Sequence, residues 1–197
     1  MTITNTDITA VILAGGQGRR MGGQDKGLID FQGRPIVEIL IEKLQAQSVE
    51  VAINANRNQI EYQRFCDRVI SDQLADFQGP LAGFAAAMVA VDTPYILTLP
   101  CDGPLLCNDY VQRFIDCHNQ TGANICVADD GDRLQPVQAL IAVELIDSLR
   151  QFLTSGERKI DRWYAQHDFA RVDFSDSSEL FRNINTPQDK TEMEQST

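Results

Sequence analysis

The feature of this sequence that most constrains its fold is an apolar run near the start of the chain that stops at a cluster of glycines. Residues 8–13 (ITAVIL) are β-branched and apolar almost throughout, which is typical of a parallel strand that is buried on both faces. Residues 13–27 (LAGGQGRRMGGQDKG) hold six glycines, two adjacent arginines and one lysine. The pattern predicts a buried strand that leads into a phosphate-binding loop.

Strand-like and helix-like patterns then alternate along the chain. Strands are expected at residues 8–13, 49–53, 68–70, 95–99, 124–128, 138–143 and 169–174. Helices are expected from Pro35, over residues 59–65, 81–89, 109–120, 146–153 and 161–166, and from Thr186-Pro187. This alternation predicts an α/β fold, in which residues 1–197 form a single three-layer α/β/α domain around a Rossmann-like, mostly parallel, twisted sheet.

Polar or glycine-rich segments follow directly after four of the expected strands. They are residues 15–27, Asn54, residues 71–72 and residues 101–102. Ligands of open parallel sheets bind outside the carboxyl ends of the strands. We therefore expect these segments to meet at one edge of the sheet and to form a binding site there.

The glycine-rich loop matches neither of the two best-known phosphate-binding motifs. A P-loop needs a lysine followed by a hydroxyl residue, but Lys26 is followed by Gly27; a dinucleotide-binding loop needs a third glycine where Met21 stands. The glycines still allow backbone N–H groups to surround an anion. Arg19 and Arg20 can make paired hydrogen bonds to phosphate oxygens, and Lys26 adds a mobile charge. A surface turn with incidental charges is the alternative interpretation.

Asp102 lies in a turn between two prolines (PCDGP) that follows the expected strand at residues 95–99. Taken alone, it suits a turn-capping residue as well as a metal ligand. A nucleoside triphosphate brings Mg²⁺, which proteins usually hold with one or two carboxylates together with phosphates and water. A phosphate loop at the same edge of the sheet favours Asp102 as a Mg²⁺ ligand.

Four further polar residues are candidate ligand contacts. Asp72 could accept hydrogen bonds from a ribose or from the N1–H and N2–H₂ groups of guanine, and Asn54 could contact either group, although both also suit ordinary loop positions. Asn183 and Asn185 flank Ile184, so their side chains point the same way in an extended segment. These two asparagines could bind a polar heterocycle or simply cap the helix that follows.

The composition argues against several classes of partner and location. The net charge is −11 with no basic stripe, which disfavours nucleic acids and anionic membranes but not a small anionic ligand. No segment reads as a signal peptide or a membrane span. The five scattered cysteines are expected to be free or buried thiols of a cytoplasmic protein. His118 and His167 are expected at the surface.

Taken together, these motifs resemble the molybdenum cofactor guanylyltransferase family, which is one group of nucleotidyltransferases. The similar blocks are LAGGQGRRMGGQDKGL, NANR, SDQLADFQGPLAG, LPCDGP and NINTP, which occur in that order over residues 13–187. The related cytidylyl enzymes typically read LAAG where this chain has Gly15. Some relatives carry threonine where this chain has Gly103, which leaves Asp102 intact.

The resemblance implies a fold of the nucleotidyltransferase type and a Mg²⁺-dependent reaction, in which GTP and molybdenum-bound molybdopterin give a guanine dinucleotide cofactor and pyrophosphate. It implies nucleotide contacts at Leu13, Ala14, Gly15, Gly16, Gly18, Lys26, Asn54, Asp72 and Asp102. It assigns catalysis to Arg19, Lys26 and Asp102, metal binding to Asp102, and pterin contacts to Asn183 and Asn185. Proteins that load molybdopterin and molybdoenzymes that accept the product are the implied protein partners.

Two other functions remain compatible with the residues. One is nucleotidyl transfer from CTP or to a sugar phosphate. The other is a non-catalytic nucleotide sensor, or an adaptor that delivers cofactor, which would keep the glycine loop without needing Asp102 in its rigid turn. The oligomeric state, the order of substrate binding and the choice between molybdenum and tungsten are left open by the sequence.

Overall fold

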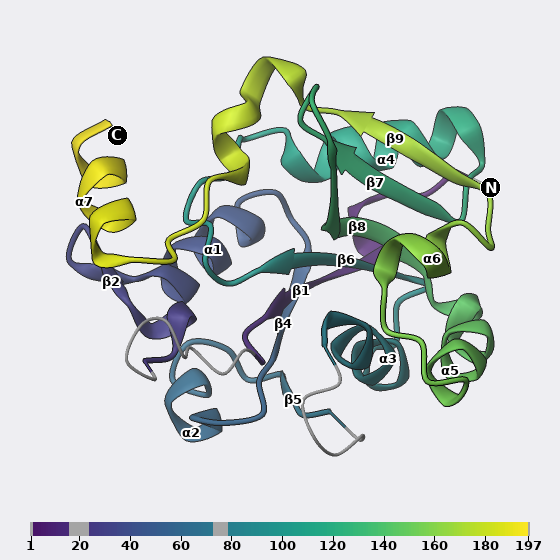
Figure 1. Cartoon of the computed structure of the whole chain (residues 1–197), viewed down its shortest axis with the longest axis horizontal. Coiled ribbons are helices and arrows are strands. Elements are labelled where there is room, and N and C mark those ends of the chain that lie inside the picture. Colours follow the sequence, from purple (N-terminus) through teal and green to yellow (C-terminus); the bar gives the residue numbers. More distant parts are fainter. Residues whose placement is uncertain (1, 16–23, 73–78, 197) are drawn as a thin grey trace.

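A computed structural model describes residues 2–15, 24–72 and 79–196, and its centre is a seven-stranded sheet with the order β5-β4-β1-β6-β8-β7-β9 (Figure 1). The strands are β1 (Ile8–Leu13), β4 (Glu50–Asn54), β5 (Val69–Ile70), β6 (Tyr95–Pro100), β7 (Ile125–Asp129), β8 (Leu134–Ala142) and β9 (Phe169–Asp173). Strands β5, β4, β1 and β6 run parallel, as do β7 and β9, whereas β8 is antiparallel to both of its neighbours. The predicted α/β fold with a mostly parallel sheet is confirmed.

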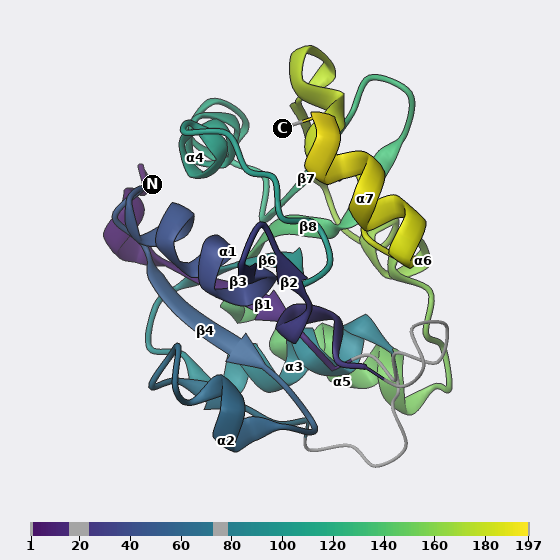
Figure 2. The ribbon, with the colours of Figure 1, turned by 90° about the vertical axis from the view of Figure 1, so that its left-hand side faces the viewer.

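Helices cover both faces of the sheet and complete three layers. One apolar core involves α1 (Ile36–Gln45), α2 (Gln59–Tyr62), α4 (Tyr110–Thr121) and α7 (Pro187–Ser196), and the other involves α3 (Pro80–Ala90), α5 (Ile146–Thr154) and α6 (Ile160–Tyr164). Figure 2 shows α1 and α4 on one side of the sheet and α3 and α5 on the other. Side chains of β1 alternate between the cores, because Ala10 and Ile12 lie in the first core and Val11 in the second.

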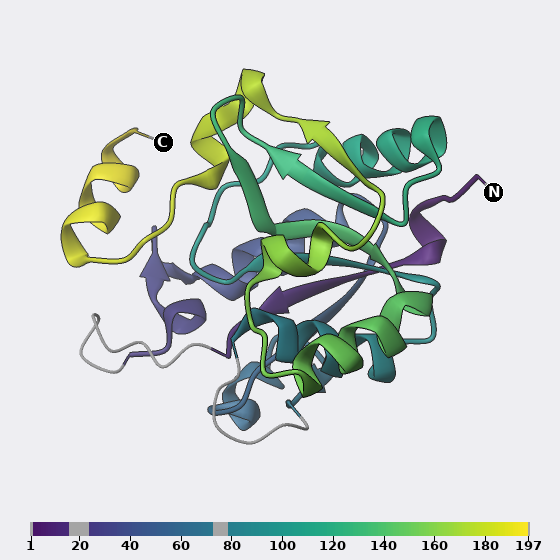
Figure 3. The same cartoon turned by 45° about the vertical axis from the view of Figure 1, so that its right-hand side comes forward.

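Strands β8, β7 and β9 form one side of the sheet (Figure 3), and one of them differs from the sequence prediction. The strand expected at residues 138–143 begins earlier, at Leu134, and forms a hairpin with β7 that contains an irregularity between Val127 and Ala128. Only a short turn at residues 130–133 joins β7 to β8. A parallel neighbour would have to begin at the same end as β7, and so short a turn cannot span the length of the strand. The two strands therefore run antiparallel.

His118 corrects a prediction, because it is buried rather than at the surface. It is 4% exposed on the inner face of α4, one or two turns after Val111, Phe114 and Ile115, which are also buried. Its ring nitrogens lie 3.0 Å from the carbonyl oxygen of Ala123 and 3.4 Å from the Tyr95 hydroxyl. The polar neighbours of His118 in the sequence suggested exposure, but its helical spacing from apolar residues places it in the core.

A small hairpin, formed by residues that follow the glycine-rich loop in the sequence, contacts the C-terminal helix. Strands β2 (Asp30–Phe31) and β3 (Arg34–Pro35) are joined by Gln32 and Gly33, whose φ angles of 53° and 84° suit a two-residue hairpin turn. The backbone N–H of Gln32 donates to Glu194 Oε1 of α7 at 3.0 Å. The NINTP segment just before α7 is therefore held beside the residues that follow the loop.

In the described part of the chain, no helix combines the length and apolarity that crossing a bilayer requires.

Candidate active site

The carboxyl ends of three parallel strands lie level with one another and define the site. In the sheet register, Leu13 of β1 pairs with Asn54 of β4 on one side and with Pro100 of β6 on the other. The ladder continues one step further, because the N–H of Ala14 donates to the Asn54 carbonyl at 2.8 Å and the N–H of Cys101 donates to the Leu13 carbonyl at 3.2 Å. The segments that begin at Ala14, after Asn54 and at Cys101 therefore start side by side, as expected from the sequence.

Lys26 joins three distant segments at this edge. It begins a short 3₁₀ turn, η3 (Lys26–Leu28), and its Nζ donates to Asp102 Oδ2 at 2.8 Å and to Asn185 Oδ1 at 2.5 Å. The side chains of Lys26 and Asp102 are 24% and 15% exposed, so this ion pair is partly shielded but open to a ligand. A residue expected to bind nucleotide thus contacts both the expected metal ligand and an expected pterin contact.

The C-terminal segment is fixed to the turn that carries Asp102. Ile184 is fully buried, and its N–H donates to the Asp102 carbonyl oxygen at 2.8 Å. A side chain at Gly103 would place its Cβ 3.2 Å from Asn183 Oδ1. Asn183 and Asn185, on either side of Ile184, therefore both lie next to the Asp102–Gly103 turn, which agrees with the expectation that they share one side of the segment.

Neither asparagine caps the helix that follows, which removes one of the alternatives left by the sequence. The capping contacts belong to Thr186 and Asp189: the N–H of Asp189 donates to Thr186 Oγ1 at 3.1 Å, and Asp189 Oδ2 accepts from the N–H groups of Asn185 and Thr186 at 2.9 and 2.8 Å. These backbone donors, with that of Asn185 the largest contribution, lower the pKa of the Asp189 carboxyl. The asparagine side chains are thus left to other partners.

Asp72 is held in a fixed orientation by two asparagines. Asn54 Nδ2 donates to Asp72 Oδ1 at 2.9 Å, and Asn56 Nδ2 donates to Asp72 Oδ2 at 2.8 Å. The N–H of Asp72 returns a hydrogen bond to Asn56 Oδ1 at 2.8 Å. Because a carboxylate has about four acceptor positions, these contacts leave Asp72 able to accept from a ligand. Sequence reasoning missed Asn56, although the NANR block contains it.

Gly83 is a second residue that the sequence reasoning missed. A Cβ at this position in α3 would lie 2.6 Å from Asn54 Oδ1 and 3.1 Å from Leu13 Cδ2. A glycine here therefore lets the helix approach the ends of β1 and β4, where Asn54 is only 2% exposed. The FQGPLAG block carried this signal, but its physical reason depends on a contact between α3 and β4.

Asp25 is a third such residue and is nearly buried beside Lys26. Its side chain is 3% exposed, its Oδ1 accepts a hydrogen bond from the Tyr62 hydroxyl, and its Oδ2 accepts from Asn58 Nδ2 at 3.2 Å. Arg57 adds a longer ion pair, with 3.9 Å between Nε and Oδ2. A charged group is this deeply buried only when it is paired, so Asp25 belongs to a specific local structure.

The donor set at Asp102 fits a metal ion that shares its other ligands with a substrate. Asp102 Oδ1 is buried and has no hydrogen-bond partner among the described residues, so one carboxylate oxygen is left unsatisfied. Across residues 2–15, 24–72 and 79–196, no three His, Cys, Asp or Glu side chains are grouped to hold a metal without a ligand. Burial raises the pKa of the neighbouring Cys101 thiol, which keeps this side chain neutral.

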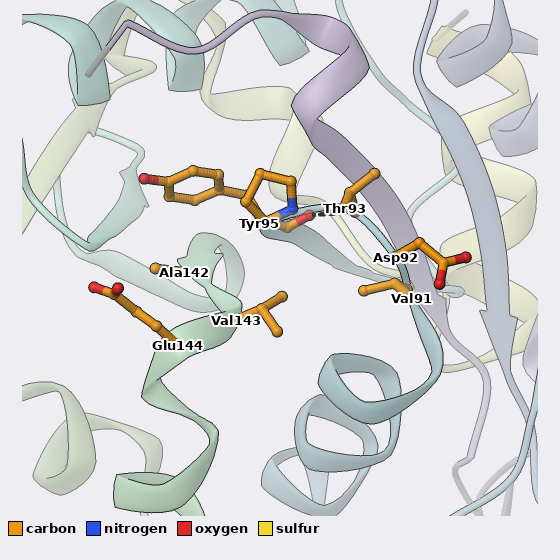
Figure 4. Close-up of a pocket in the computed structure, with 8 residues that line it drawn as sticks. Val91, Asp92, Thr93, Tyr95, Ala142, Val143 and Glu144 are labelled. Atoms are coloured by element: carbon orange, nitrogen blue, oxygen red, sulfur yellow. Dashed lines mark hydrogen bonds between the residues drawn. The ribbon is translucent and has the colours of Figure 1, made fainter.

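Two concave regions lie at very different places relative to this cluster. A cleft of about 540 Å³ lies between η3, α2 and α7, with Asp25, Asn58, Pro187 and Lys190 among its lining residues. A pocket of about 370 Å³, drawn in Figure 4, is lined by residues 91–95 and 142–144. The second pocket lies where β6 begins and β8 ends, which is the end of the sheet opposite to Asp102, and contains no residue that the sequence assigned to the site.

Gly16, Gly18, Arg19 and Arg20 lie outside the described residues. Their expected contacts with phosphate stay predictions.

The comparisons with known proteins agree with the fold. A sequence model described as the MobA-like NTP transferase domain matches residues 10–172. The chain therefore has the fold of a nucleotidyltransferase. A crystal structure of molybdopterin-guanine dinucleotide biosynthesis protein A from Archaeoglobus fulgidus superposes with a TM-score of 0.77, covering 96% of this chain and 97% of that chain at 21% identity.

Close relatives extend over almost the whole chain. The molybdenum cofactor guanylyltransferase of Shewanella sediminis is 48% identical over 186 residues, which are 94% of this chain and 95% of that protein. The protein of the same name from Shewanella halifaxensis is also 48% identical, over 94% of this chain and 93% of its own length. The chain belongs to the molybdenum cofactor guanylyltransferase family, which confirms the resemblance seen in its motifs.

Proposed function

We propose that the protein transfers GMP from GTP to the phosphate of molybdenum-bound molybdopterin, which forms the guanine dinucleotide cofactor and releases pyrophosphate. The observation that carries this proposal is the contact of Lys26 with both Asp102 and Asn185 at one edge of the sheet. It supports the proposal because the three side chains that would bind phosphate, metal and the second substrate contact one another. The names of the close relatives support GTP as the donor and the molybdenum cofactor as the acceptor.

The nucleotide would lie across the ends of β1, β4 and β6. Leu13 and Ala14 would contact the nucleotide where β1 ends, and backbone groups at Gly15, Gly16 and Gly18 would surround the triphosphate. Asp72, fixed by Asn54 and Asn56, would accept hydrogen bonds from guanine or ribose. Because both carboxylate oxygens are already oriented, little conformational entropy is lost when the base binds.

The chemistry requires alignment and charge neutralisation rather than a protein base. The attacking group is a phosphate monoester, which is largely ionised at neutral pH because its second pKa is about 6. One of its oxygens bonds to the α-phosphorus of GTP while the bond from that phosphorus to the bridging oxygen breaks, and pyrophosphate leaves. Lys26, with Arg19 from the loop, would stabilise the negative charge that builds up on the phosphates.

Asp102 would hold Mg²⁺ through its unsatisfied Oδ1, with phosphate oxygens and water as the remaining ligands. The metal would supply further neutralisation of phosphate charge. Asp102 also holds Lys26 in place through Oδ2, so a single carboxylate would organise both cations of the site.

Asn183 and Asn185 would contact the pterin. Both lie beside the Asp102–Gly103 turn, and neither is used as a helix cap. Amide groups present donors and acceptors together, which suits the mixed edge of a pterin ring. Their attachment to the turn through Ile184 would hold the second substrate close to the α-phosphate.

We further propose that residues 1–197 act as one domain in the cytoplasm. One sheet combines strands from both halves of the chain, which supports a single domain. The five cysteines, all within the described residues, are free thiols, which supports a reducing compartment. Proteins that load molybdopterin and molybdoenzymes that receive the product would be its transient partners.

The test is to incubate the purified protein with molybdopterin and each of the four nucleoside triphosphates, with and without Mg²⁺, and to follow pyrophosphate release. We expect Mg²⁺-dependent release with GTP and formation of a guanine dinucleotide product. Pyrophosphate release with CTP but not with GTP would assign a different nucleotide donor. Tight GTP binding without turnover would instead indicate a nucleotide sensor.

A further inference from the structure

The proposed reaction gives no role to the buried carboxylate next to Lys26. Asp25 is 6% exposed as a residue, and its side chain contacts the segment at residues 57–62. Its φ of −77° and ψ of 119° are extended, and its side chain does not cap the 3₁₀ turn that follows. The usual local role of an aspartate before a helical turn is therefore absent, and the carboxylate is committed to a tertiary contact.

The contact between Asp25 and Tyr62, called the Asp25–Tyr62 tether below, is anchored by a fully buried side chain. Tyr62 is fully buried at the end of α2, and its hydroxyl donates to Asp25 Oδ1. Burial is the main cause of a raised pKa for Tyr62, so the hydroxyl keeps its proton and remains a donor. A proton donor that is held in the core fixes the position of the carboxylate that accepts from it.

Gly27 allows the backbone of η3 to approach Tyr62 closely. A Cβ at Gly27 would lie 2.6 Å from Tyr62 Oη and 3.3 Å from Cys101 Cβ. The backbone of η3 is thus pressed between α2 and the turn that carries Asp102. Lys26 lies between the tethered Asp25 and this glycine, so the backbone on both of its sides is held against the core.

Lys26 has a long side chain that needs such support. A lysine side chain has many rotamers, so its direction is well defined only where the backbone that carries it is fixed. Asp25 contacts Asn58 and Tyr62, whereas Lys26 contacts Asp102 and Asn185 in two other segments. The tether therefore sets the point from which the lysine reaches the phosphates.

We propose that Asp25 and Tyr62 are positioning residues for nucleotidyl transfer, which act by fixing the backbone from which Lys26 reaches Asp102 and the transferred phosphate. This inference rests on the role proposed above for Lys26. The tether accounts for the aspartate of the DKGL block through a contact between the loop and α2.

The direct test removes only the hydroxyl, with Tyr62→Phe. Misplacing a group that stabilises the transition state by about 1 Å can cost about 100-fold in rate, so kcat is expected to fall by about 10- to 100-fold. The KM for GTP is expected to change far less, because backbone groups of the loop and Asp72 still bind the nucleotide. Asp25→Asn, which keeps the shape of the side chain and an acceptor oxygen, is expected to lower kcat less than Tyr62→Phe.

Tyr110→Phe is the matched control. Tyr110 is also fully buried, and its hydroxyl donates to Gln138 Oε1 at 2.8 Å, between α4 and β8. Each variant loses one buried hydrogen bond, so similar decreases in melting temperature are expected. Only Tyr62→Phe is expected to lower kcat; equal kcat in the two variants overturns the proposal.

Two further measurements separate positioning from general stabilisation. In a Lys26→Met background, Tyr62→Phe is expected to cause no further loss of kcat, whereas a full additional loss shows that the tyrosine does not act through Lys26. Crystal structures of the nucleotide-free proteins should show Lys26 Nζ on Asp102 in wild type and Tyr110→Phe but displaced in Tyr62→Phe. An unmoved lysine overturns the inference, while a wild-type protein that is inactive with GTP and molybdopterin overturns the proposed function instead.

Discussion

The two ends of the central sheet differ in how their polar side chains are paired, although Arg68 Nη1 at the amino end of the parallel strands also lacks a hydrogen bond within the described part of the chain and has only an ion pair with Glu50 at 3.6 Å. At the carboxyl end of the parallel strands, Asp102 keeps a buried oxygen without a partner among the described residues, and Lys26 reaches across to two other segments. At the other end, Thr9 and Thr93 hydrogen-bond each other at 2.8 Å, and Thr93 Oγ1 also donates to the Tyr95 carbonyl at 3.0 Å. Polar groups that hydrogen-bond one another stabilise the fold, whereas a buried polar atom without a partner is available to bind a ligand.

The comparison also explains why a concave surface alone does not identify the site. The pocket in Figure 4 lies at the amino end of the parallel strands β1 and β6. Asp92, Thr93, Tyr95 and Glu144 are among its lining residues. The Tyr95 hydroxyl lies 3.4 Å from His118 Nε2, and Glu144 Oε1 accepts from Asn124 Nδ2 at 2.9 Å. The chemistry of the lining, rather than the volume of the pocket, distinguishes the two ends.

The largest effect is expected from removing either charge of the central ion pair. Lys26→Ala and Asp102→Ala should each lower kcat by about 10²- to 10³-fold, because each removes charge stabilisation that is needed in the transition state. Circular dichroism should show a normal fold, because both side chains are partly exposed at a sheet edge. Pyrophosphate release measures the loss, and near-normal rates in either variant would contradict the assignment.

The next effect concerns the binding of the nucleotide rather than turnover. Asn56→Ala removes two of the three hydrogen bonds that hold Asp72 and leaves the one from Asn54, and the loss of a hydrogen bond to a charged group costs about 1.5–3 kcal/mol. The KM for GTP should therefore rise about tenfold, with kcat little changed. Asn124→Ala, at the opposite end of the sheet, is the matched control, and an equal rise in KM there would remove the distinction between the two ends.

A substitution at the amino end of the parallel strands should affect stability without affecting activity. Thr93→Val removes the partner of the fully buried Thr9 hydroxyl, which should lower the free energy of unfolding by about 1–3 kcal/mol. Urea denaturation measures this change, and steady-state assays should give wild-type kcat and KM. A clear loss of turnover in this variant would show that the two ends are functionally coupled.

The smallest effect is a pH dependence at the start of α7. Backbone N–H donors lower the pKa of Asp189 below its ordinary value of 3.8, so its stabilising contribution is present at neutral pH and lost as the pH falls through the lowered value. The melting temperature of Asp189→Asn should be below that of wild type at pH 7, and the difference should shrink below about pH 4. A difference that does not change with pH would show that the negative charge is unimportant.

Much of the architecture could be predicted from local patterns in the sequence. The apolar run at residues 8–13 has no polar alternation, so only a strand covered on both faces can accommodate it. The positions of Asn54, Asp72 and Asp102 just after strands placed them at one edge, because parallel strands end together. The family resemblance then supplied expected roles for these residues, which local patterns left open.

Other features required the tertiary structure. Lys26 and Asn185 are 159 residues apart, and their contact depends on how α7 packs against the β2–β3 hairpin. The burial of Asp25 depends on Tyr62, and the need for Gly83 depends on the close approach of α3 to Asn54. No local pattern encodes such contacts, because each partner is an ordinary residue in its own segment.

The sequence by itself therefore determined the sheet, the edge at which the candidate site lies and the family of the protein, because hydrophobic periodicity and motif spacing are local properties. The tertiary structure alone decided which side chains satisfy one another and which remain open to a ligand. It placed His118 in the core, oriented Asp72 through Asn56 and left Asp102 Oδ1 open among the described residues. Hydrogen-bond satisfaction is a property of neighbours in space, so it becomes visible only once the chain has folded.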